Sequence, residues 1–361
     1  MKKTGIVLLA VLASGVGAGA QAPVGEYAPK HYVAYRALDS LEVDGRLDEP
    51  SWQRAAWTDF FVDIEGDAKP LPRFKTRAKM LWDDSYFYIA ADMEEPHVWG
   101  TLKKRDSVIF HDNDFEVFID PDGDTHAYYE FEINALGTEW DLLLLKPYRD
   151  GGPAVNAWDI AGLRTAVQVW GTLNDPDDVD QGWSVEMAFP WKVLREAARR
   201  PSPPRDGDRW RVNFSRVEWE ATADDGVYTK VEGRREDNWV WSPQGLINMH
   251  YPERWGWVHF AAEPVGEGQV EFEPDPAEEA RELLRQVYYA QRKFRRKNKR
   301  FSADLDSLGV GHRILRHYLW PPKVEVTGRL FEASLEEVVD VDGDGAISRW
   351  VIAQDSRLWK E

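Results

Sequence analysis

The chain contains no cysteine among its 361 residues, which excludes both a disulfide framework and a lipid-anchored export product. After residue 20 no apolar run approaches the length of a membrane helix, so we expect no membrane span in the rest of the chain. Positive charge is also scarce, because 45 Lys and Arg stand against 63 Asp and Glu, for a net charge of −18. Such a charge repels nucleic-acid phosphates and anionic membrane surfaces, so nucleic acid is excluded as a partner.

The first 20 residues have the pattern of a cleavable signal peptide. Lys2 and Lys3 form a basic start, residues 5–16 are apolar, and residues 18–20 offer a small-residue cleavage site. The apolar segment is too short to span a bilayer. We therefore expect an exported protein that is secreted, periplasmic or held at the cell surface.

The remaining sequence predicts four segments. Residues 21–36 have the pattern of an extended lead-in, and residues 37–261 that of a mainly β, antiparallel β-sandwich. Residues 262–275 are acidic and rich in Pro and Gly, which indicates a linker. Residues 276–361 then predict a small α+β appendage, with a helix over residues 276–301 and two strands near residues 323–338 and 346–354.

Within the sandwich region, short alternating stretches are separated by Asp, Gly and Pro turns, as is typical of strands. "LEVDG" predicts a short strand before a turn, and Asp48 is the expected N-cap of a brief helix that starts at Pro50. Residues 83–85 predict a hairpin turn. Further strands are expected at residues 114–120, 127–134, 139–145, 165–170, 183–189, 210–219, 238–241 and 255–260, with one helix at residues 190–198.

Two neighbouring predicted strands carry a heavy load of acidic side chains. Because side chains alternate along a strand, Phe115, Val117 and Ile119 share one face of the first strand. If the two strands pair, the opposite face gathers carboxylates, an amide and aromatic rings: Asp114, Glu116, Phe118, Asp120, Tyr128, Glu130, Glu132 and Asn134.

Three interpretations of this acidic face are open. A glycosidase places two carboxylates about 5–10 Å apart around the scissile bond, for which Glu116 with Glu130 or Glu132 would serve. The residues also suit the solvated face of an antiparallel sheet. Finally, they suit a saccharide-binding face, where polar groups bind hydroxyls and rings stack on the sugar.

Several motifs resemble one family. "VDGRLDEPSW", "AKMLWDDSYFYIAADMEE", "DNDFEVFIDPDGDTHAYYEFEINALGTEWDL", "GWSVEMAFPW" and "PERWGWVHF" are similar to family 9 carbohydrate-binding modules, in order and in approximate spacing. "PYRDGG" and "WSPQGLINMH" extend the resemblance to the exported family 9-like branch. The resemblance covers residues 37–261 and implies a β-sandwich that binds saccharides, with bound calcium, beside a glycoside hydrolase or in place of one.

The resemblance also implies roles for particular residues. The family's binding-site glutamate corresponds to Glu116, and its binding-site asparagine corresponds to Asn134. The two Trp side chains that clamp the sugar in xylanase-linked members correspond to positions near Phe110 and Met249, and a family arginine corresponds to Glu132. The expected saccharide site comprises Phe110, Asp114, Glu116, Tyr128, Glu132, Asn134 and Met249.

The run "DPDGD" sets Asp120, Asp122 and Asp124 at alternate positions around a glycine. Calcium takes about six to eight oxygen ligands, and this run supplies several on one tight turn. Together with the calcium that the family resemblance implies, it is our candidate site for a structural Ca²⁺. The run "DVDGDG" at residues 340–345 repeats the spacing between two predicted strands, where we expect only a turn.

Together these observations predict an exported, non-catalytic carbohydrate-binding protein linked to polysaccharide breakdown, with a saccharide as ligand and glycoside hydrolases as partners. The first alternative is a glycoside hydrolase that uses Glu116 and a second carboxylate. The second is a surface interaction domain that keeps the fold and has lost the sugar.

Overall fold

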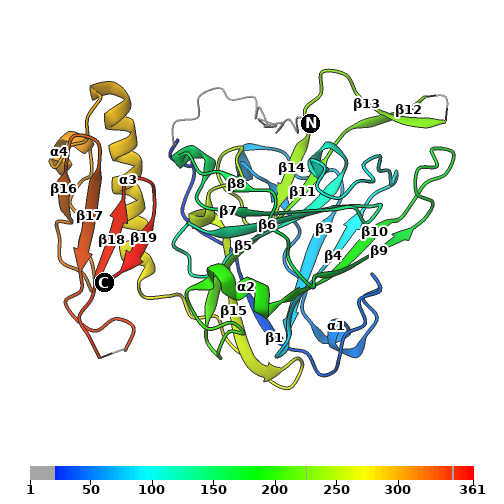
Figure 1. Ribbon diagram of the computed structural model, residues 1–361, viewed down its shortest axis with the longest axis horizontal. Coiled ribbons are helices and arrows are strands. Elements are labelled where there is room, and N and C mark those ends of the chain that lie inside the picture. The colour runs from blue at the N-terminus through cyan, green and yellow to red at the C-terminus, as the bar shows by residue number, and fades with distance from the viewer. Residues whose placement is uncertain (1–20, 225, 344) are drawn as a thin grey trace, which may run out of the picture.

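The computed structural model describes residues 21–224, 226–343 and 345–361, so the predicted signal peptide lies outside the described residues. These residues form a large β-sandwich with a smaller α+β appendage beside it (Figure 1). In the described part of the chain, no helix has both the length and the apolar character needed to cross a membrane.

Thirteen strands of the sandwich belong to one hydrogen-bonded sheet, which confirms the predicted mainly β fold. Their bounds are β1 His31–Arg36, β2 Val62–Asp63, β3 Thr76–Trp82, β4 Tyr86–Glu94, β5 Asp114–Asp120, β6 Tyr128–Asn134, β7 Glu139–Leu144, β8 Ala154–Val155, β9 Arg164–Trp170, β10 Gly182–Pro190, β11 Arg209–Glu218, β14 Asp237–Val240 and β15 Gly256–Pro264. The main path runs β8-β7-β6-β5-β11-β15-β1-β3-β4-β10-β9, and β14 pairs with β11 and β2.

The two halves of this sheet pack face to face. Met80 and Phe87 from β3 and β4 share one buried apolar cluster with Phe115 and Phe131 from β5 and β6. The rings of Phe131 and Phe189 meet edge to face across the layers, with centroids 5.7 Å apart. The alternation of apolar residues in β5 and β6 therefore supplies one wall of the sandwich core, as predicted.

Strand β1 lies inside the segment that was predicted as an extended lead-in. It runs parallel to β15 on one side and to β3 on the other, so it joins the two halves of the sheet. The sheet therefore includes residues before residue 37. Sequence patterns could not show this, because both neighbours of β1 are distant in the chain.

The strand predicted within "LEVDG" does not form, since residues 41–43 have no regular structure. The backbone N–H groups of Asp44 and Gly45 donate instead to the carboxylate of Glu186, at 3.1 and 3.3 Å. A side chain from β10 thus satisfies two backbone groups of the turn that follows residues 41–43.

Helix α1 (Pro50–Arg54) begins after Glu49, so the prediction of Asp48 as its N-cap is wrong. No side chain caps this helix, and Pro50 reduces the need for a cap because it has no backbone N–H. Helix α2 (Trp191–Ala198) confirms the second predicted helix. The sequence did not predict the separate hairpin of β12 and β13, at Ala221–Asp224 and Val227–Lys230, or the 3-10 helices η1 Gly66–Ala68, η2 Ile109–His111, η3 Tyr148–Asp150 and η4 Pro252–Arg254.

The appendage packs helix α3 (Glu278–Asn298) against a four-stranded antiparallel sheet, with the short helix α4 (Leu305–Leu308) at one end. The sequence predicted two strands here, but the first splits at a turn closed by Thr327 and Leu330, and a final short strand was missed. The four strands are β16 Lys323–Val326, β17 Phe331–Glu336, β18 Arg349–Ala353 and β19 Leu358–Lys360.

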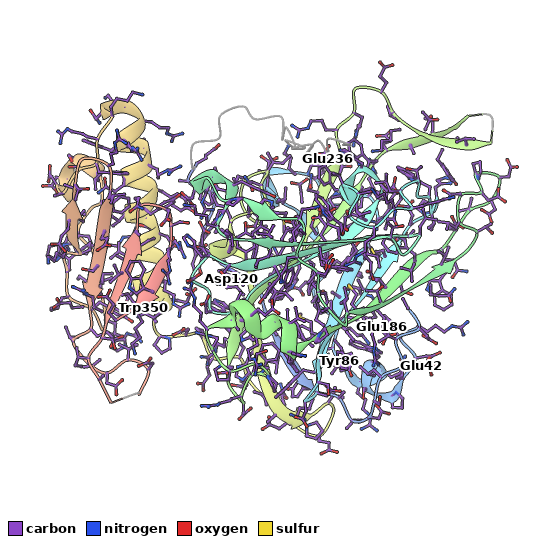
Figure 2. The ribbon with its side chains drawn as sticks, in the orientation of Figure 1. Glu42, Tyr86, Asp120, Glu186, Glu236 and Trp350 are labelled. Atoms are coloured by element: carbon purple, nitrogen blue, oxygen red, sulfur yellow. The ribbon has the colours of Figure 1, made fainter. Side chains whose placement is uncertain are left out.

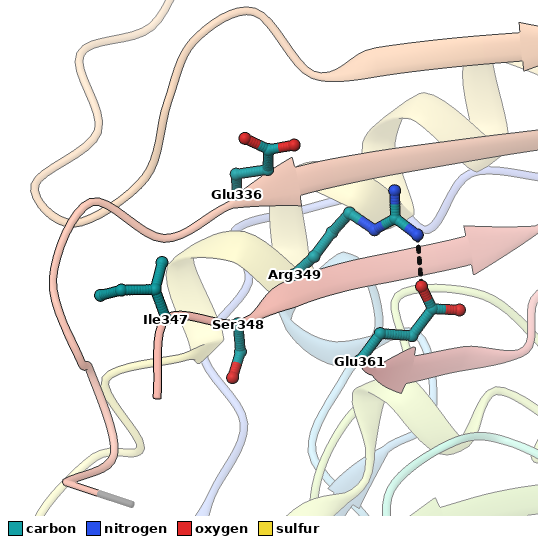
Figure 3. Close-up of a pocket in the computed structure, with 5 residues that line it drawn as sticks. All are labelled: Glu336, Ile347, Ser348, Arg349 and Glu361. Atoms are coloured by element: carbon teal, nitrogen blue, oxygen red, sulfur yellow. Dashed lines mark hydrogen bonds and ion pairs between the residues drawn. The ribbon is translucent and has the colours of Figure 1, made fainter. Parts of the chain in front are cut away.

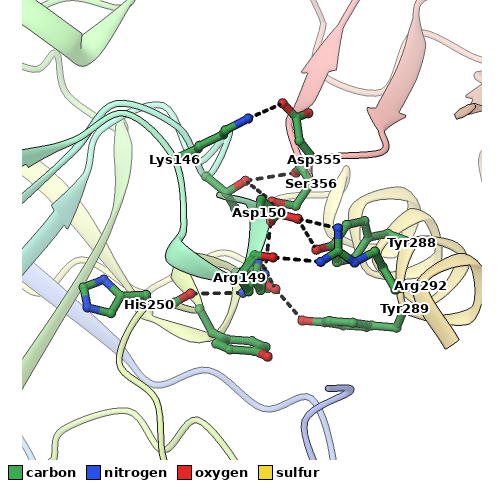
Figure 4. A network of polar contacts seen from close by, with 12 residues as sticks. Lys146, Arg149, Asp150, His250, Tyr288, Tyr289, Arg292, Asp355 and Ser356 are labelled. Carbon is green, nitrogen blue, oxygen red and sulfur yellow. Dashed lines mark hydrogen bonds and ion pairs between the residues drawn. The ribbon is translucent and has the colours of Figure 1, made fainter. Parts of the chain in front are cut away.

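A polar network joins the appendage to the sandwich (Figure 4). Arg149 in η3 pairs with Glu253 in η4 at 2.9 Å, and both side chains are buried. The adjacent Asp150 accepts hydrogen bonds from the hydroxyls of Tyr288 in α3, at 2.7 Å, and of Ser356, at 2.8 Å. The two parts of the chain are therefore held together by buried, directional contacts.

The loop after β5 contributes to the same contact. Asp120, the last residue of β5, lies on the side of the sandwich that faces the appendage (Figure 2). The Thr125 hydroxyl donates to the carbonyl of Ser356 at 2.9 Å, and the N–H of Leu358 donates to the carbonyl of Asp124 at 3.2 Å. This loop is thus a docking surface for the turn between β18 and β19.

Candidate functional site

The candidate site is the outer face of β5 and β6. The two strands pair antiparallel, with Glu116 directly opposite Glu132 and Asp114 directly opposite Asn134. On the other side of β5 lies β11, which places Ser215 opposite Glu116. The structure therefore confirms that the acidic side chains share one face and adds a third strand to it.

This face is not solvated, so the interpretation as charged residues on an exposed sheet surface is wrong. Glu116 is only 5% exposed and Asp114 is 0% exposed. An apolar cluster buries the face, and it combines side chains of β5, β6, β7 and β14 with others from loops. The buried members of that cluster are Ile64, Ile109, Phe118, Tyr128, Trp140, Leu142, Leu144, Val240, Met249 and Trp255.

The carboxylates on this face have few partners. Glu132 accepts a hydrogen bond from the N–H of Phe110 at 3.0 Å, and Asp114 accepts one from the N–H of Val217 at 3.3 Å. The second oxygen of Asp114 and one oxygen of Glu130 are buried without a hydrogen-bond partner. Burying such an oxygen costs free energy, because it loses its hydrogen bonds to water and forms none within the protein.

Burial raises the pKa of Glu116 to about 7. Burial, followed by the negative charge of Glu116, also raises the pKa values of Asp114, Glu130 and Glu132. Among the described residues, no Lys or Arg forms an ion pair with any of these acids. One oxygen each of Asp114, Glu116 and Glu132 lies within 4.8 Å of the others, so the charges are concentrated.

Asn134 is already fully engaged within the protein. Its amide nitrogen donates to Leu102 and to the carboxylate of Asp112, both at 2.9 Å. Its amide oxygen accepts the N–H groups of Leu136 and Thr138, at 3.1 and 3.0 Å. In this structure Asn134 therefore fixes the loops around the site.

The other predicted site residues lie together around the same face. Met249 is buried in the covering cluster, and Phe110 packs against that cluster from a half-buried position. The hydroxyl of Tyr128 and Nδ1 of His250 lie 2.9 Å apart. The 46% exposed Tyr148 packs its ring edge to face with His250, at a centroid distance of 4.4 Å.

Sequence reasoning missed Trp219 and Ser215. The indole of Trp219 donates to the carbonyl of Phe110 at 2.8 Å, and the ammonium of Lys230 lies 3.5 Å from its ring centroid. Ser215 lies in β11, and Trp219 is the residue directly after that strand. Their place beside β5 depends on a strand pairing between distant segments, which leaves no local signal in the sequence.

The aspartates of the predicted calcium loop also come together, with one oxygen of each within 4.8 Å of the others. Asp120 accepts the N–H groups of Gly123 and Thr125, at 3.0 and 2.9 Å. Asp124 pairs with Arg199 at 2.9 Å and with Arg357 at 3.3 Å. The oxygen-only donors suit calcium in kind, but two arginines already offset the charge of Asp124.

Two other features are less suited to a site. In the run at residues 340–345, Asp340 accepts the N–H groups of Gly343 and Gly345, at 2.7 and 2.8 Å, as in the predicted turn. A pocket in the appendage (Figure 3) is open and is crossed by an ion pair between Arg349 and Glu361. Its lining residues are Glu336, Ile347, Ser348, Arg349 and Glu361.

The fold is a mainly β sandwich whose two sheet halves pack face to face. On one outer surface, a buried polar face lies beneath a second apolar cluster. The chain belongs to the carbohydrate family 9 binding domain-like family, whose model matches residues 43–256. This confirms the family resemblance of the sequence motifs.

Individual relatives are distant. The exoglucanase XynX of Acetivibrio thermocellus is 27% identical over 117 residues, which are 32% of this chain and 9% of that protein. A family 9 carbohydrate-binding module from Caldicellulosiruptor kristjanssonii, solved with cellotriose and also with glucose, is 14% and 15% identical respectively. Each covers 67% of this chain and 100% of its own, with a TM-score of 0.43. A putative carbohydrate-binding protein from Bacteroides uniformis is 17% identical, covers 64% of this chain and 100% of its own, and has a TM-score of 0.47.

Proposed function

We propose that the chain is an exported, non-catalytic carbohydrate-binding protein whose ligand contacts the outer face of β5 and β6. Family membership over residues 43–256 carries this proposal. Glu116 supports it from the geometry, because this acid lies at the centre of the face, between Glu132 on β6 and Ser215 on β11. Around it, the aromatic side chains of Phe110 and Tyr148 are partly accessible.

Export and a role in polysaccharide breakdown are further parts of the proposal. Export rests on the pattern of residues 1–20. A partnership with glycoside hydrolases is supported by the curated relative that is named an exoglucanase, although the chain spans only 9% of that protein.

A glycan array on the chain from residue 21 onward tests the binding function. Cellotriose and glucose, which were bound to the similar solved module, are the first soluble ligands for titration calorimetry. We expect at least one saccharide to bind. If the full array and both sugars give no signal, the chain is instead an interaction domain that has kept the fold without the sugar.

A glycoside hydrolase is the second candidate, because burial raises the pKa of Glu116 to about 7, a value suited to a general acid. Its partner would be Glu132, directly across the strand pair. We expect no reducing-sugar release from polysaccharides or aryl glycosides by the wild-type chain. Release that disappears in Glu116→Gln would establish the enzyme and overturn the binding proposal.

A further inference from the structure

The acids on the outer face of β5 and β6 lack a compensating positive charge. Asp114, Glu116, Glu130 and Glu132 are each at least 94% buried, and none of them forms an ion pair with Lys or Arg among the described residues. By contrast, the buried acid Glu253 pairs with Arg149, and Asp124 pairs with two arginines. Glu253 and Asp124 thus have cationic partners that these four acids lack.

Two oxygens at this face also lack any hydrogen-bond donor. One belongs to Asp114, which is one of the three acids that each place an oxygen within 4.8 Å of the others. The other belongs to Glu130, on the same face of β6 as Glu132 and two residues from it. A buried carboxylate oxygen normally finds a donor or a cation, so these two atoms indicate a missing positive partner.

The donor set identifies the kind of cation. Asp114, Glu116 and Glu132 offer only carboxylate oxygens, and the hydroxyl of Ser215 lies across the strand from Glu116. Hard divalent cations such as calcium bind oxygen ligands at about 2.3–2.6 Å, so two ligands of one ion lie no more than about 5 Å apart. One oxygen of each of the three acids lies within 4.8 Å of the others, which meets this condition. Deep burial favours a small ion over an organic cation.

We infer that Asp114, Glu116 and Glu132 bind a calcium ion on the outer face of β5 and β6, separate from the aspartate loop that follows β5. The ion would offset the charge of the buried acids and could accept a saccharide hydroxyl as a further ligand. That last step rests on the proposed saccharide function. The binding of the ion itself does not.

The test is calcium titration of the full exported chain after treatment with a chelator and in the absence of sugar, by calorimetry and by thermal unfolding. Glu132→Gln keeps the size of the side chain and removes one ligand charge. We expect it to weaken calcium binding at one site at least about tenfold, because the number of ligand charges sets calcium affinity. Glu42→Gln, at an exposed glutamate outside the acidic clusters, is the matched control and should leave calcium binding unchanged.

Stability separates a lost ion from a damaged fold. In chelator, Glu132→Gln should melt at the same temperature as the wild type or higher, because it removes one of several buried like charges. When calcium is added, the melting temperature of the wild type should rise more than that of this variant. If Glu132→Gln destabilises the chelated protein, Asp114→Asn provides the same comparison at a second ligand.

Two results would overturn the inference. One is the absence of calcium binding by the wild type. The other is unchanged calcium binding in both Glu132→Gln and Asp114→Asn. Neither result depends on sugar, so a failed glycan array would leave this test unaffected, and a failed calcium titration would leave saccharide binding open to its own test.

Discussion

Glu116 and Glu132 face each other across β5 and β6 as a buried pair of like charges. Like charges directly opposite each other destabilise an antiparallel pair. The strands nevertheless pair without interruption from Asp114 opposite Asn134 to Ile119 opposite Tyr129. The surrounding packing therefore holds the two acids in a position that they would not adopt by themselves, as is common at binding and catalytic sites.

Glu116→Ala should weaken saccharide binding by about 1.5–3 kcal/mol, the usual range for a hydrogen bond to a charged group. Titration calorimetry with a saccharide identified on the array measures this difference. Glu42→Ala, at an exposed residue of the same type, is the control and should bind like the wild type. An affinity that does not change in Glu116→Ala would remove this residue from the site.

Asp122→Asn tests calcium at the aspartate loop. Burial and the charge of Asp124 raise the pKa of Asp122 to about 6, so a cation here would relieve repulsion between them. If the loop binds calcium, the melting temperature of the wild type should be higher in calcium than in chelator, and the variant should lose part of that difference. Identical melting behaviour of the wild type and the variant in both conditions would show that the aspartates form only a turn.

Arg149→Ala should destabilise the protein by about 3–5 kcal/mol, because it leaves Glu253 as a buried charge without its partner. Urea unfolding at neutral pH gives the free energy. Lys323→Ala removes an exposed ion pair with Glu325 and should cost less than about 1 kcal/mol. Similar small losses in both variants would show that the buried pair contributes little.

The same pair predicts a pH dependence. Burial alone would raise the pKa of Glu253, but Arg149 lowers it to about 2, below its ordinary value of 4.5. The unfolded chain therefore binds a proton before the folded chain does, so stability is lost as pH falls from about 4.5 towards 2. Above pH 4.5 the free energy of unfolding of the wild type should exceed that of Glu253→Gln by up to about 3 kcal/mol. This difference should shrink below pH 4.5. Urea unfolding across this range measures it, and a difference that stays constant with pH would contradict the assignment.

The alternation of β5 and β6 could be predicted because it is a local pattern with a period of two. It correctly placed Phe115 and Phe131 in the core and Glu116 and Glu132 together on the other face. The burial of that face could not be predicted, because the covering residues Ile109, Met249 and Trp255 come from separate loops. Nor could the sequence show that the strand predicted within "LEVDG" does not form and that a glutamate from β10 binds the turn after it.

The consecutive residues Tyr148, Arg149 and Asp150 have a consequence for where the protein can be divided. Tyr148 contacts His250 beside the candidate site, Arg149 binds Glu253, and Asp150 receives hydrogen bonds from the appendage. A chain cut after residue 264, at the end of β15, would keep every strand of the sandwich and remove both hydroxyl donors to Asp150. The part that carries the family motifs is therefore not chemically complete by itself, and the outer face of β5 and β6 should be studied with the appendage attached.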